Sequence, residues 1–393
     1  MRFLFVGSGL CLQLPSVSAS RRTPLPLANA SYYQARSGLT PPSYRPCRAH
    51  KEKAQHSIIY AVLKANAYGL GLDWMVDVLQ QQGLSHFAVS DIEDALHVRE
   101  LSRASEILLL NPVEAADDLL AAIRRQITIT ISSVRQAAII DAFCAGLSES
   151  ISAHVETDTG MGRCGIFHKD ASQLIKLYRD YPNIRITGIY THVYNAPNER
   201  HTREQIDHFS DILKMLRSAG IRPGIAHMAS SLVMFRYPDS LFDAVRIGSA
   251  LTGRIASRND WGLQKVGVIE TAISDIRDLS RGQNIGYGVF RVKRQTTAAV
   301  VPSGYLSGFG LEKRRDLFRL RDLCRVVLRF FKAFISRKPL YVTVNGMNAP
   351  VLGRIGMTNI IVDIGAICCR VGDKVQMESN PMLSGNLLRA EYR

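Results

Sequence analysis

Between Ile58 and Ile247, short apolar segments alternate with longer amphipathic ones, and this alternation constrains the fold more than any other feature of the chain. Near-continuous apolar strands in such an order are typical of a parallel sheet buried on both faces. Eight strand–helix units in about 200 residues predict a closed (β/α)8 TIM-type barrel, an α/β fold, rather than an open sheet. The predicted strands are Ile58–Leu63, Phe87–Ser90, Ile107–Leu110, Ile127–Ile131, Ser152–Glu156, Ile184–Tyr190, Gly224–His227 and Ala244–Ile247. The clearest predicted helices are Leu72–Gln82, Asp91–Ser102, Glu114–Arg125, Val134–Ala145, Lys169–Tyr181 and Arg203–Ala219, and the eighth helix is the weakest element.

The pattern changes after residue 257. Residues 265–305 and 340–377 alternate apolar and polar side chains between Gly, Asn and Pro turns, which predicts an all-β second domain. Between them, 311–338 places apolar residues at helical spacing among arginines. It predicts an amphipathic helical insertion packed on the β domain, with a helix for a membrane surface or an anionic partner as the alternative.

We therefore expect three parts. Residues 1–53 form an irregular basic segment, 54–257 a barrel, and 258–393 a C-terminal β domain with the helical insertion 311–338. Within the first part, the apolar stretch Phe3–Leu14 before Ser16–Ser20 resembles a secretion signal. The Pro/Ser/Arg-rich run up to Arg48 has no helix or strand pattern and predicts disorder instead.

Charge and cysteine usage narrow the function classes. The net charge is +15, but 1–53 and 311–338 each carry +7, so the fold itself is nearly neutral. A nucleic-acid-binding face should lie on the fold, and we therefore expect no nucleic-acid partner. The seven cysteines include no CxxC pair, which favours a reducing, cytoplasmic location and argues against a structural metal site. No apolar run reaches the roughly 18–20 residues of a membrane span.

Lys64 is the most informative single residue. The predicted strand Ile58–Leu63 ends on this lysine, and the Gly-containing run Ala65–Gly71 separates it from an amphipathic helix. Desolvation favours the neutral form of an amine at such a position. A neutral amine beside a small-residue turn and a helix N-terminus suits an aldehyde cofactor that carries a phosphate, namely pyridoxal 5'-phosphate (PLP). The alternative is a lysine whose amine simply reaches solvent.

Other polar residues follow the carboxyl ends of the predicted strands, where barrel enzymes place their sites. Arg246 and the small residues Gly248 and Ser249 follow the last strand, the usual phosphate-binding end, and Tyr68 and Ser231 could add hydroxyl donors. For each serine, a helix N-cap is the alternative. His192 is a candidate acid/base, a ring that stacks on the cofactor, or a structural histidine. Asp158 is expected to order the Gly160–Gly162 loop rather than bind a metal.

Together these motifs resemble the alanine racemase family of fold-type III PLP enzymes over roughly residues 57–393. The matching motifs are Leu63–Gly69, Asp158–Arg163, Thr191-His192, His227–Ser231, Val245–Gly248, Gly286-Tyr287-Gly288, Pro302–Tyr305 and Gly353–Met357. Their joint order and spacing are specific, although each motif alone is weak.

The resemblance implies a PLP-dependent alanine racemase with two catalytic bases, Lys64 on one face of the cofactor and Tyr287 on the other. It implies that Lys64 holds PLP covalently and that Tyr287 comes from the partner subunit, so that a homodimer shares its active sites. Arg246 would contact the pyridine nitrogen and His192 would orient Arg246. The residues implied for cofactor binding are Lys64, Tyr68, Arg163, His192, Ser231, Arg246, Gly248 and Ser249. Those implied for the small amino-acid substrate are Arg163, Met357 and Tyr305.

The chain also departs from the family pattern. Glu156 stands where many relatives have a lysine modified to a carbamate, and its carboxylate could orient Arg163 directly. Thr358 replaces the usual acidic residue after Met357, and the usual opening strand is hard to find in residues 1–56. The resemblance implies D-alanine production for peptidoglycan. The alternatives are a racemase of serine or a basic amino acid, or a PLP-binding homologue that has lost catalysis.

Overall fold

The computed structural model describes residues 32–34, 54, 57–257, 259, 261–285, 290–310, 328, 340–378, 381–384 and 389–391. Tyr287, most of the 1–53 segment and all of the 311–338 insertion except Leu328 lie outside the described residues. The expectations for them, including a signal-like N-terminus and a helical insertion, stay predictions.

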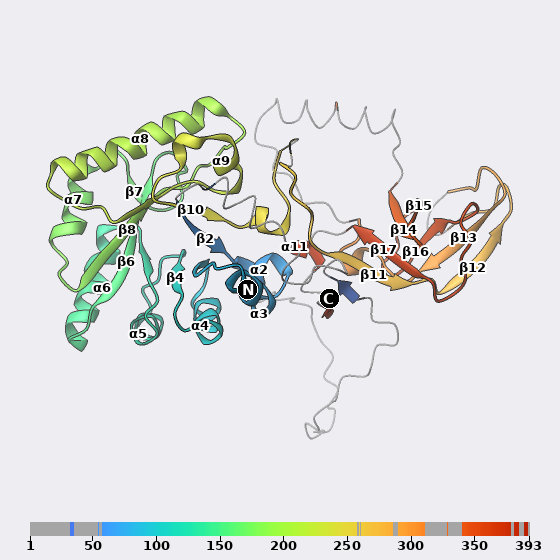
Figure 1. Ribbon diagram of the computed structural model, residues 1–393, viewed down its shortest axis with the longest axis horizontal. Coiled ribbons are helices and arrows are strands. Elements are labelled where there is room, and N and C mark those ends of the chain that lie inside the picture. Colours follow the sequence, from blue (N-terminus) through green and yellow to red (C-terminus); the bar gives the residue numbers. More distant parts are fainter. Residues whose placement is uncertain are drawn as a thin grey trace, which may run out of the picture. The chain divides into compact units, whose positions relative to one another are not determined.

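Eight parallel strands form the barrel, as the alternation predicts (Figure 1). They are hydrogen-bonded in the order β4-β3-β2-β10-β9-β8-β6-β5, and a parallel bridge between Leu108 and Thr128 joins β4 to the segment that leads into β5. This bridge closes the barrel. The strands are β2 (Ile58–Val62), β3 (His86–Val89), β4 (Glu106–Leu109), β5 (Ile129–Ile131), β6 (Ile151–Asp158), β8 (Ile184–Tyr190), β9 (Ile225–His227) and β10 (Ala244–Ile247).

Amphipathic helices cover the outside of this sheet (Figure 1). The first six are α3 (Leu72–Gln81), α4 (Ile92–Leu101), α5 (Ala116–Arg124), α6 (Val134–Leu147), α7 (Ala171–Arg179) and α8 (Glu199–Ser218). Helix α8 begins four residues before the predicted start, because the Asn198 side chain caps it by accepting the N–H of His201. β9 is followed by the six-residue α9 (Ser231–Arg236) and the 3-10 turn Pro238–Ser240. β10 is followed by the 3-10 turn Ser249–Thr252, which agrees with the weak eighth helix.

Apolar residues on both faces of the parallel sheet are buried, and these are the residues whose runs predict the strands. Ala61, Phe87, Ile129, Val155 and Val245 are all fully buried. Burial on both faces explains why these strands lack the polar–apolar alternation of a one-sided sheet. Within the described residues, no helix is long and apolar enough to span a bilayer, and no three His, Cys, Asp or Glu side chains are placed to share a metal ion.

The second domain is all β, as predicted. Its sheet has the order β12-β13-β16-β15-β14-β17-β11-β1-β18, and every pair from β12 to β1 is antiparallel. The strands are β11 (Val268–Ala272), β12 (Asp275–Leu279), β13 (Thr296–Val301), β14 (Tyr341–Val344), β15 (Met347–Leu352), β16 (Ile360–Asp363), β17 (Lys374–Glu378) and β18 (Arg389–Glu391), with a short helix α11 (Pro381–Ser384) before the last.

One expectation for the N-terminal segment differs from the structure. Tyr32–Gln34 form a strand, β1, that pairs antiparallel with β11 and parallel with β18. Three residues are too few to show a strand periodicity in the sequence. The strand is defined by its pairing with partners more than 200 residues away.

Two glycines before β9 differ in how closely neighbouring backbone approaches them. Gly220 and Gly224 both have positive φ (74° and 79°), but a Cβ at Gly220 meets nothing within 4 Å, whereas one at Gly224 would overlap the Thr187 carbonyl. We expect Gly220→Ala to lower the free energy of unfolding by about 1 kcal/mol, because alanine is strained at this positive φ. Gly224→Ala should lower the free energy of unfolding by about 1–3 kcal/mol more than Gly220→Ala, because its Cβ would also overlap the Thr187 carbonyl. Urea unfolding measures both, and equal losses would contradict the close packing of β9 on β8.

Candidate active site

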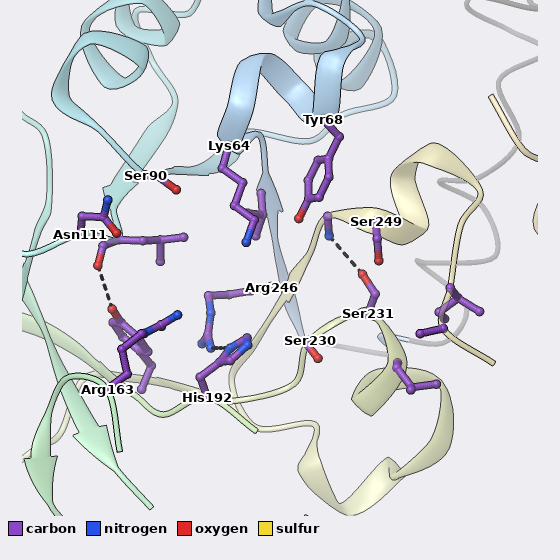
Figure 2. Close-up of a pocket in the computed structure, with 17 residues that line it drawn as sticks. Lys64, Tyr68, Ser90, Asn111, Arg163, His192, Ser230, Ser231, Arg246 and Ser249 are labelled. Carbon is purple, nitrogen blue, oxygen red and sulfur yellow. Dashed lines mark hydrogen bonds between the residues drawn. The ribbon is translucent and has the colours of Figure 1, made fainter. Parts of the chain in front are cut away.

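A cavity of about 340 Å³ opens at the carboxyl ends of the barrel strands (Figure 2). This volume lies in the range of small-ligand sites. Figure 2 shows the Lys64 amine and the Tyr68 hydroxyl pointing into the same space as the Arg246 and His192 side chains. Lining residues come from the ends of β2, β3, β4, β8, β9 and β10 and from the loop after β6: Val62, Lys64, Tyr68, Ser90, Leu110, Asn111, Arg163, Tyr190, His192, Ser230, Ser231, Leu232, Arg246, Gly248, Ser249, Ile255 and Ala256.

A left-handed turn places Lys64 and Tyr68. The segment Lys64–Gly69 (α2) contains four consecutive non-glycine residues, Ala65 to Tyr68, with φ between 52° and 57°. Such residues cost about 1–2 kcal/mol each, so the surroundings must hold the turn. The Asn66 side chain accepts the Leu72 N–H at 2.9 Å, and the Ala67 N–H donates to the Leu63 carbonyl at 2.8 Å. Lys64 is an exposed residue although it follows a buried strand, and its amine points into the cavity (Figure 2). The neutral amine expected from the sequence stays a prediction.

Tyr68, Ser231 and Gly248 form one end of the cavity. A Cβ at Gly248 would overlap the Tyr68 hydroxyl, so only glycine lets this phenol approach the β10 backbone. The Ser231 hydroxyl accepts the N–H groups of Gly248 (3.1 Å) and Ala250 (3.3 Å), which leaves its own hydrogen to donate into the cavity. Burial raises the pKa of Tyr68 to about 12, so the phenol also stays a donor. These donors suit an anion such as a phosphate.

Arg246 is the buried cation at the floor of the cavity. It is 5% exposed, and its Nη1 donates to the Nδ1 (2.6 Å) and carbonyl (3.2 Å) of His227. Its Nη2 donates to the Thr191 carbonyl (2.7 Å) and to His192 Nδ1 (3.3 Å). The four Nη hydrogens are therefore used, and within the described residues only the Nε–H has no acceptor. All four acceptors are neutral, and the guanidinium lies 4.6 Å over the Tyr190 ring.

The two histidines that contact Arg246 are held neutral. Burial and the positive charge of Arg246 lower the pKa of His192 to about 3 and lower the pKa of His227 well below the usual value. Since arginine cannot accept a hydrogen bond, the contacted Nδ1 atoms are both acceptors and the hydrogens lie on Nε2. His227 is the closer partner, so it shares the orienting role that the sequence reading gave to His192 alone.

Arg163 and Glu156 lie at the side of the cavity. Glu156 is 4% exposed at the end of β6, and its carboxylate is 3.7 Å from the exposed guanidinium of Arg163. Burial raises the pKa of Glu156, although Arg163 and Arg246 oppose the shift. The Asp158 carboxylate accepts the N–H groups of Gly160, Met161 and Gly162, which confirms that it orders the loop carrying Arg163.

The sequence reading missed several lining residues and named others that lie elsewhere. Ser90 and Asn111 follow the ends of β3 and β4, the same positional signal that identified Lys64, but they form no recognisable motif. Tyr305 and Met357 lie together in the β domain, where the N–H groups of Tyr305 and Leu306 donate to the carbonyls of Gly356 and Met357. Neither lines this cavity, and Tyr287 lies outside the described residues.

Family models match most of the chain. The alanine racemase N-terminal domain matches residues 45–255 and the alanine racemase C-terminal domain matches 266–386. This protein belongs to the alanine racemase family.

Individual relatives agree with this assignment. The chain is 28% identical to the alanine racemase of Methanococcus maripaludis over 328 residues, which are 81% of each chain. It is 28% identical to the serine/alanine racemase of Enterococcus gallinarum over 320 residues, 78% of this chain and 41% of that protein. Among solved structures, the alanine racemase of Clostridium difficile 630 has the same fold, with a TM-score of 0.76 over 93% of this chain and 96% of that one at 23% identity.

The neutral histidines predict acid sensitivity. Burial and the charge of Arg246 lower the pKa values of His154, in the barrel interior, and His192 to about 3, and that of His227 also falls well below 6.5. Below pH 6.5 the unfolded chain therefore binds more protons than the folded one, and the free energy of unfolding falls as the pH falls toward 3. Each ring contributes about 1.4 kcal/mol between pH 7.5 and 5.5, or about 4 kcal/mol for three. The raised pKa values of Glu156 and Asp94 act in the opposite direction, whereas the pKa values of His86 and His168, which burial lowers, act in the same direction as the three rings.

Urea unfolding at pH 7.5 and 5.5 measures this difference. An unchanged free energy of unfolding would mean that these rings are charged in the folded protein or already neutral in the unfolded one.

Proposed function

We propose that this protein is a PLP-dependent racemase that interconverts L-alanine and D-alanine with two bases, Lys64 and Tyr287. The proposal is carried by the pairing of a cavity-facing lysine with a buried arginine whose Nε–H is its one donor without an acceptor among the described residues. Membership of the alanine racemase family supports the same activity.

The residues of the cavity fit PLP. Tyr68, Ser231 and the N–H of Ser249 would hold its phosphate, and Gly248, whose N–H donates to Ser231, would leave room beside them. Arg246 would hold its ring nitrogen, and Lys64 its aldehyde carbon. The bound cofactor supplies delocalisation for the electron pair left at the substrate Cα when a proton leaves. The space that Gly248 leaves for the Tyr68 hydroxyl and the neutral acceptors around Arg246 support this assignment.

Racemisation requires a proton to leave one face of Cα and to return on the other. The Nζ of Lys64 would hold or release a proton on one face, and the phenolic oxygen of Tyr287 would do so on the other. Arg246 would donate its Nε–H to a ring nitrogen and keep the proton, because a guanidinium is far too weak an acid to give it up. A ring nitrogen held by Arg246 without a proton of its own would withdraw electrons less, which would favour return of the proton to Cα.

Arg163 would bind the substrate carboxylate. Its guanidinium is exposed toward the cavity, and Glu156 restrains it from one side. A guanidinium matches a carboxylate in geometry and charge. This pair would therefore select an α-amino acid and fix which face of Cα each base meets.

We further propose a homodimer with shared active sites. Tyr305 and Met357 were inferred to border the substrate, yet they do not line the cavity of their own chain. A second copy would supply them, together with Tyr287. We propose that the product supplies D-alanine for peptidoglycan in the cytoplasm.

Serine is the second candidate substrate. One relative is named a serine/alanine racemase, and it matches this chain at 28% identity. Thr358 follows Met357 and adds a hydroxyl where the family commonly has an acidic residue. A panel of alanine, serine, lysine and arginine ranks these substrates by kcat/KM.

The first prediction concerns the phosphate end of the cavity. Gly248→Ala should push the Tyr68 hydroxyl aside and raise the apparent Kd for PLP by on the order of tenfold or more, because hydrogen bonds to a charged group are lost. Gly146→Ala is the matched control, since a Cβ there meets nothing within 4 Å. Titration by visible absorbance measures both. Unchanged affinity in Gly248→Ala would place the phosphate elsewhere.

The second prediction tests the reaction. Protein supplemented with PLP and incubated with L-alanine in D₂O should yield D-alanine deuterated at Cα, measured by ¹H NMR and chiral chromatography. Lys64→Ala should abolish both signals because the cofactor anchor and one base are lost, while Lys176→Ala on the exposed face of α7 should not.

Three outcomes separate the alternatives. Deuterium exchange without D-alanine would mean that the second base fails, and Tyr287→Phe should reproduce that result in an active enzyme. No exchange with alanine but exchange with serine would favour the second candidate. No exchange with any amino acid, despite bound PLP, would contradict racemase activity.

A further inference from the structure

Two histidines occupy a place in the barrel interior that apolar side chains usually fill. His154 on β6 is 2% exposed and His227 on β9 is fully buried. His154 Nδ1 lies 2.9 Å from His227 Nε2, and His227 Nδ1 in turn lies 2.6 Å from Arg246 Nη1. The proposed mechanism assigns no role to His154, so its burial needs a reason.

The direction of these hydrogen bonds follows from Arg246. The guanidinium can only donate, so His227 Nδ1 must be an acceptor and the hydrogen of this neutral ring must lie on Nε2. That hydrogen is then donated to His154 Nδ1, and the hydrogen of His154 lies on its own Nε2. The chain Arg246→His227→His154 therefore has one orientation. Burial and the nearby charge of Arg246 lower the pKa of both rings, which keeps them neutral.

The barrel backbone makes room for the His154 ring in two ways. A Cβ at Gly188 on β8 would lie 2.6 Å from His154 Nε2, so any other residue there would displace the imidazole. The pairing of β6 with β8 also shifts by one residue at this point, from Ala153 opposite Ile186 to His154 opposite Gly188. Glycine inside a strand and a β-bulge both weaken a sheet, so together they mark a position where the imidazole matters.

Two aromatic rings restrict the orientation of the His227 imidazole. Tyr60 and Tyr190 stack on it with ring centroids 5.5 Å and 5.0 Å away and interplanar angles of 22° and 21°. These rings hold the imidazole plane, so the two nitrogens can face only Arg246 and His154. Without an acceptor at position 154, the His227 Nε2–H would be buried without a partner.

We propose that His154 is a positioning residue for Arg246: it accepts the His227 Nε2–H, fixes the tautomer of His227 and so holds the arginine with its Nε–H free for the cavity. The catalytic part of this inference rests on the proposed racemase function. The hydrogen-bond chain itself does not, because it requires only the folded protein.

The first test reads the tautomers directly. Ring ¹⁵N spectra of histidine-labelled protein should show both His154 and His227 as neutral Nε2–H tautomers at pH 7, assigned by the signals lost in His154→Asn and His154→Leu. A charged ring, or an Nδ1–H tautomer at His227, would overturn the proposal whether or not the protein is a racemase.

The second test uses the variants as holoenzymes. His154→Leu removes the acceptor, so kcat should fall on the order of tenfold with little change in KM, because Arg246 would contact the cofactor and not the substrate carboxylate. His154→Asn keeps an acceptor oxygen near the place of Nδ1 and should restore most of kcat. His86→Gln is the matched control, since the His86 ring touches Tyr60 (5.2 Å) but belongs to no such chain.

Urea unfolding separates folding from positioning. Equal loss of kcat in the Asn and Leu variants, or a loss that follows their unfolding free energies, would overturn the positioning role. Wild-type protein that shows the expected tautomers but racemises no amino acid would contradict the proposed function and leave the hydrogen-bond chain intact.

Discussion

The burial of Arg246 is the constraint on which the rest of the site depends. Arg246 is 5% exposed, so its guanidinium loses hydration at a cost of several kcal/mol that hydrogen bonds and aromatic contact must offset. The barrel provides these through Thr191 and His192 after β8, His227 on β9 and the Tyr190 ring. None of the four acceptors is a carboxylate. The charge is therefore not neutralised by its partners. Burial, and to a lesser extent this charge, lowers the pKa of His192 and His227 and keeps both rings neutral.

A strained turn after β2 and Gly248 after β10 shape the part of the cavity next to Arg246. Four left-handed residues between Lys64 and Gly69 cost energy that the Asn66–Leu72 hydrogen bond and the buried Ala67 help to offset. In return, one short turn presents both an amine and a phenol to the same space. Gly248 completes the arrangement from β10, because any side chain there would exclude the Tyr68 hydroxyl. A buried cation and a strained turn thus line the same cavity of about 340 Å³ from two neighbouring strands, β10 and β2.

Much of the fold could be predicted because it depends on local periodicity. All eight barrel strands and the six long helices lie within a few residues of their predicted bounds. The failures have a common cause. β1 exists only through its pairing with β11 and β18, the early start of α8 depends on one cap, and the left-handed turn after Lys64 looks like an ordinary loop in the sequence. The site shows the same division: strand-end residues such as Arg246 and Ser231 could be predicted from position, whereas His154 lies in mid-strand and gave no signal.

The sequence by itself determined the α/β class of the barrel, the all-β class of the second domain, the family, and which residues follow the ends of the barrel strands. Each of these depends on the spacing of residue types along the chain. The tertiary structure decided which of those residues meet. It brought His227 closer to Arg246 than His192, set Glu156 against Arg163, and left Tyr305 and Met357 outside the cavity. The physical reason is that hydrogen-bond partners, burial and steric overlap depend on atoms from strands far apart in the sequence. These atoms come close to one another only in the folded barrel.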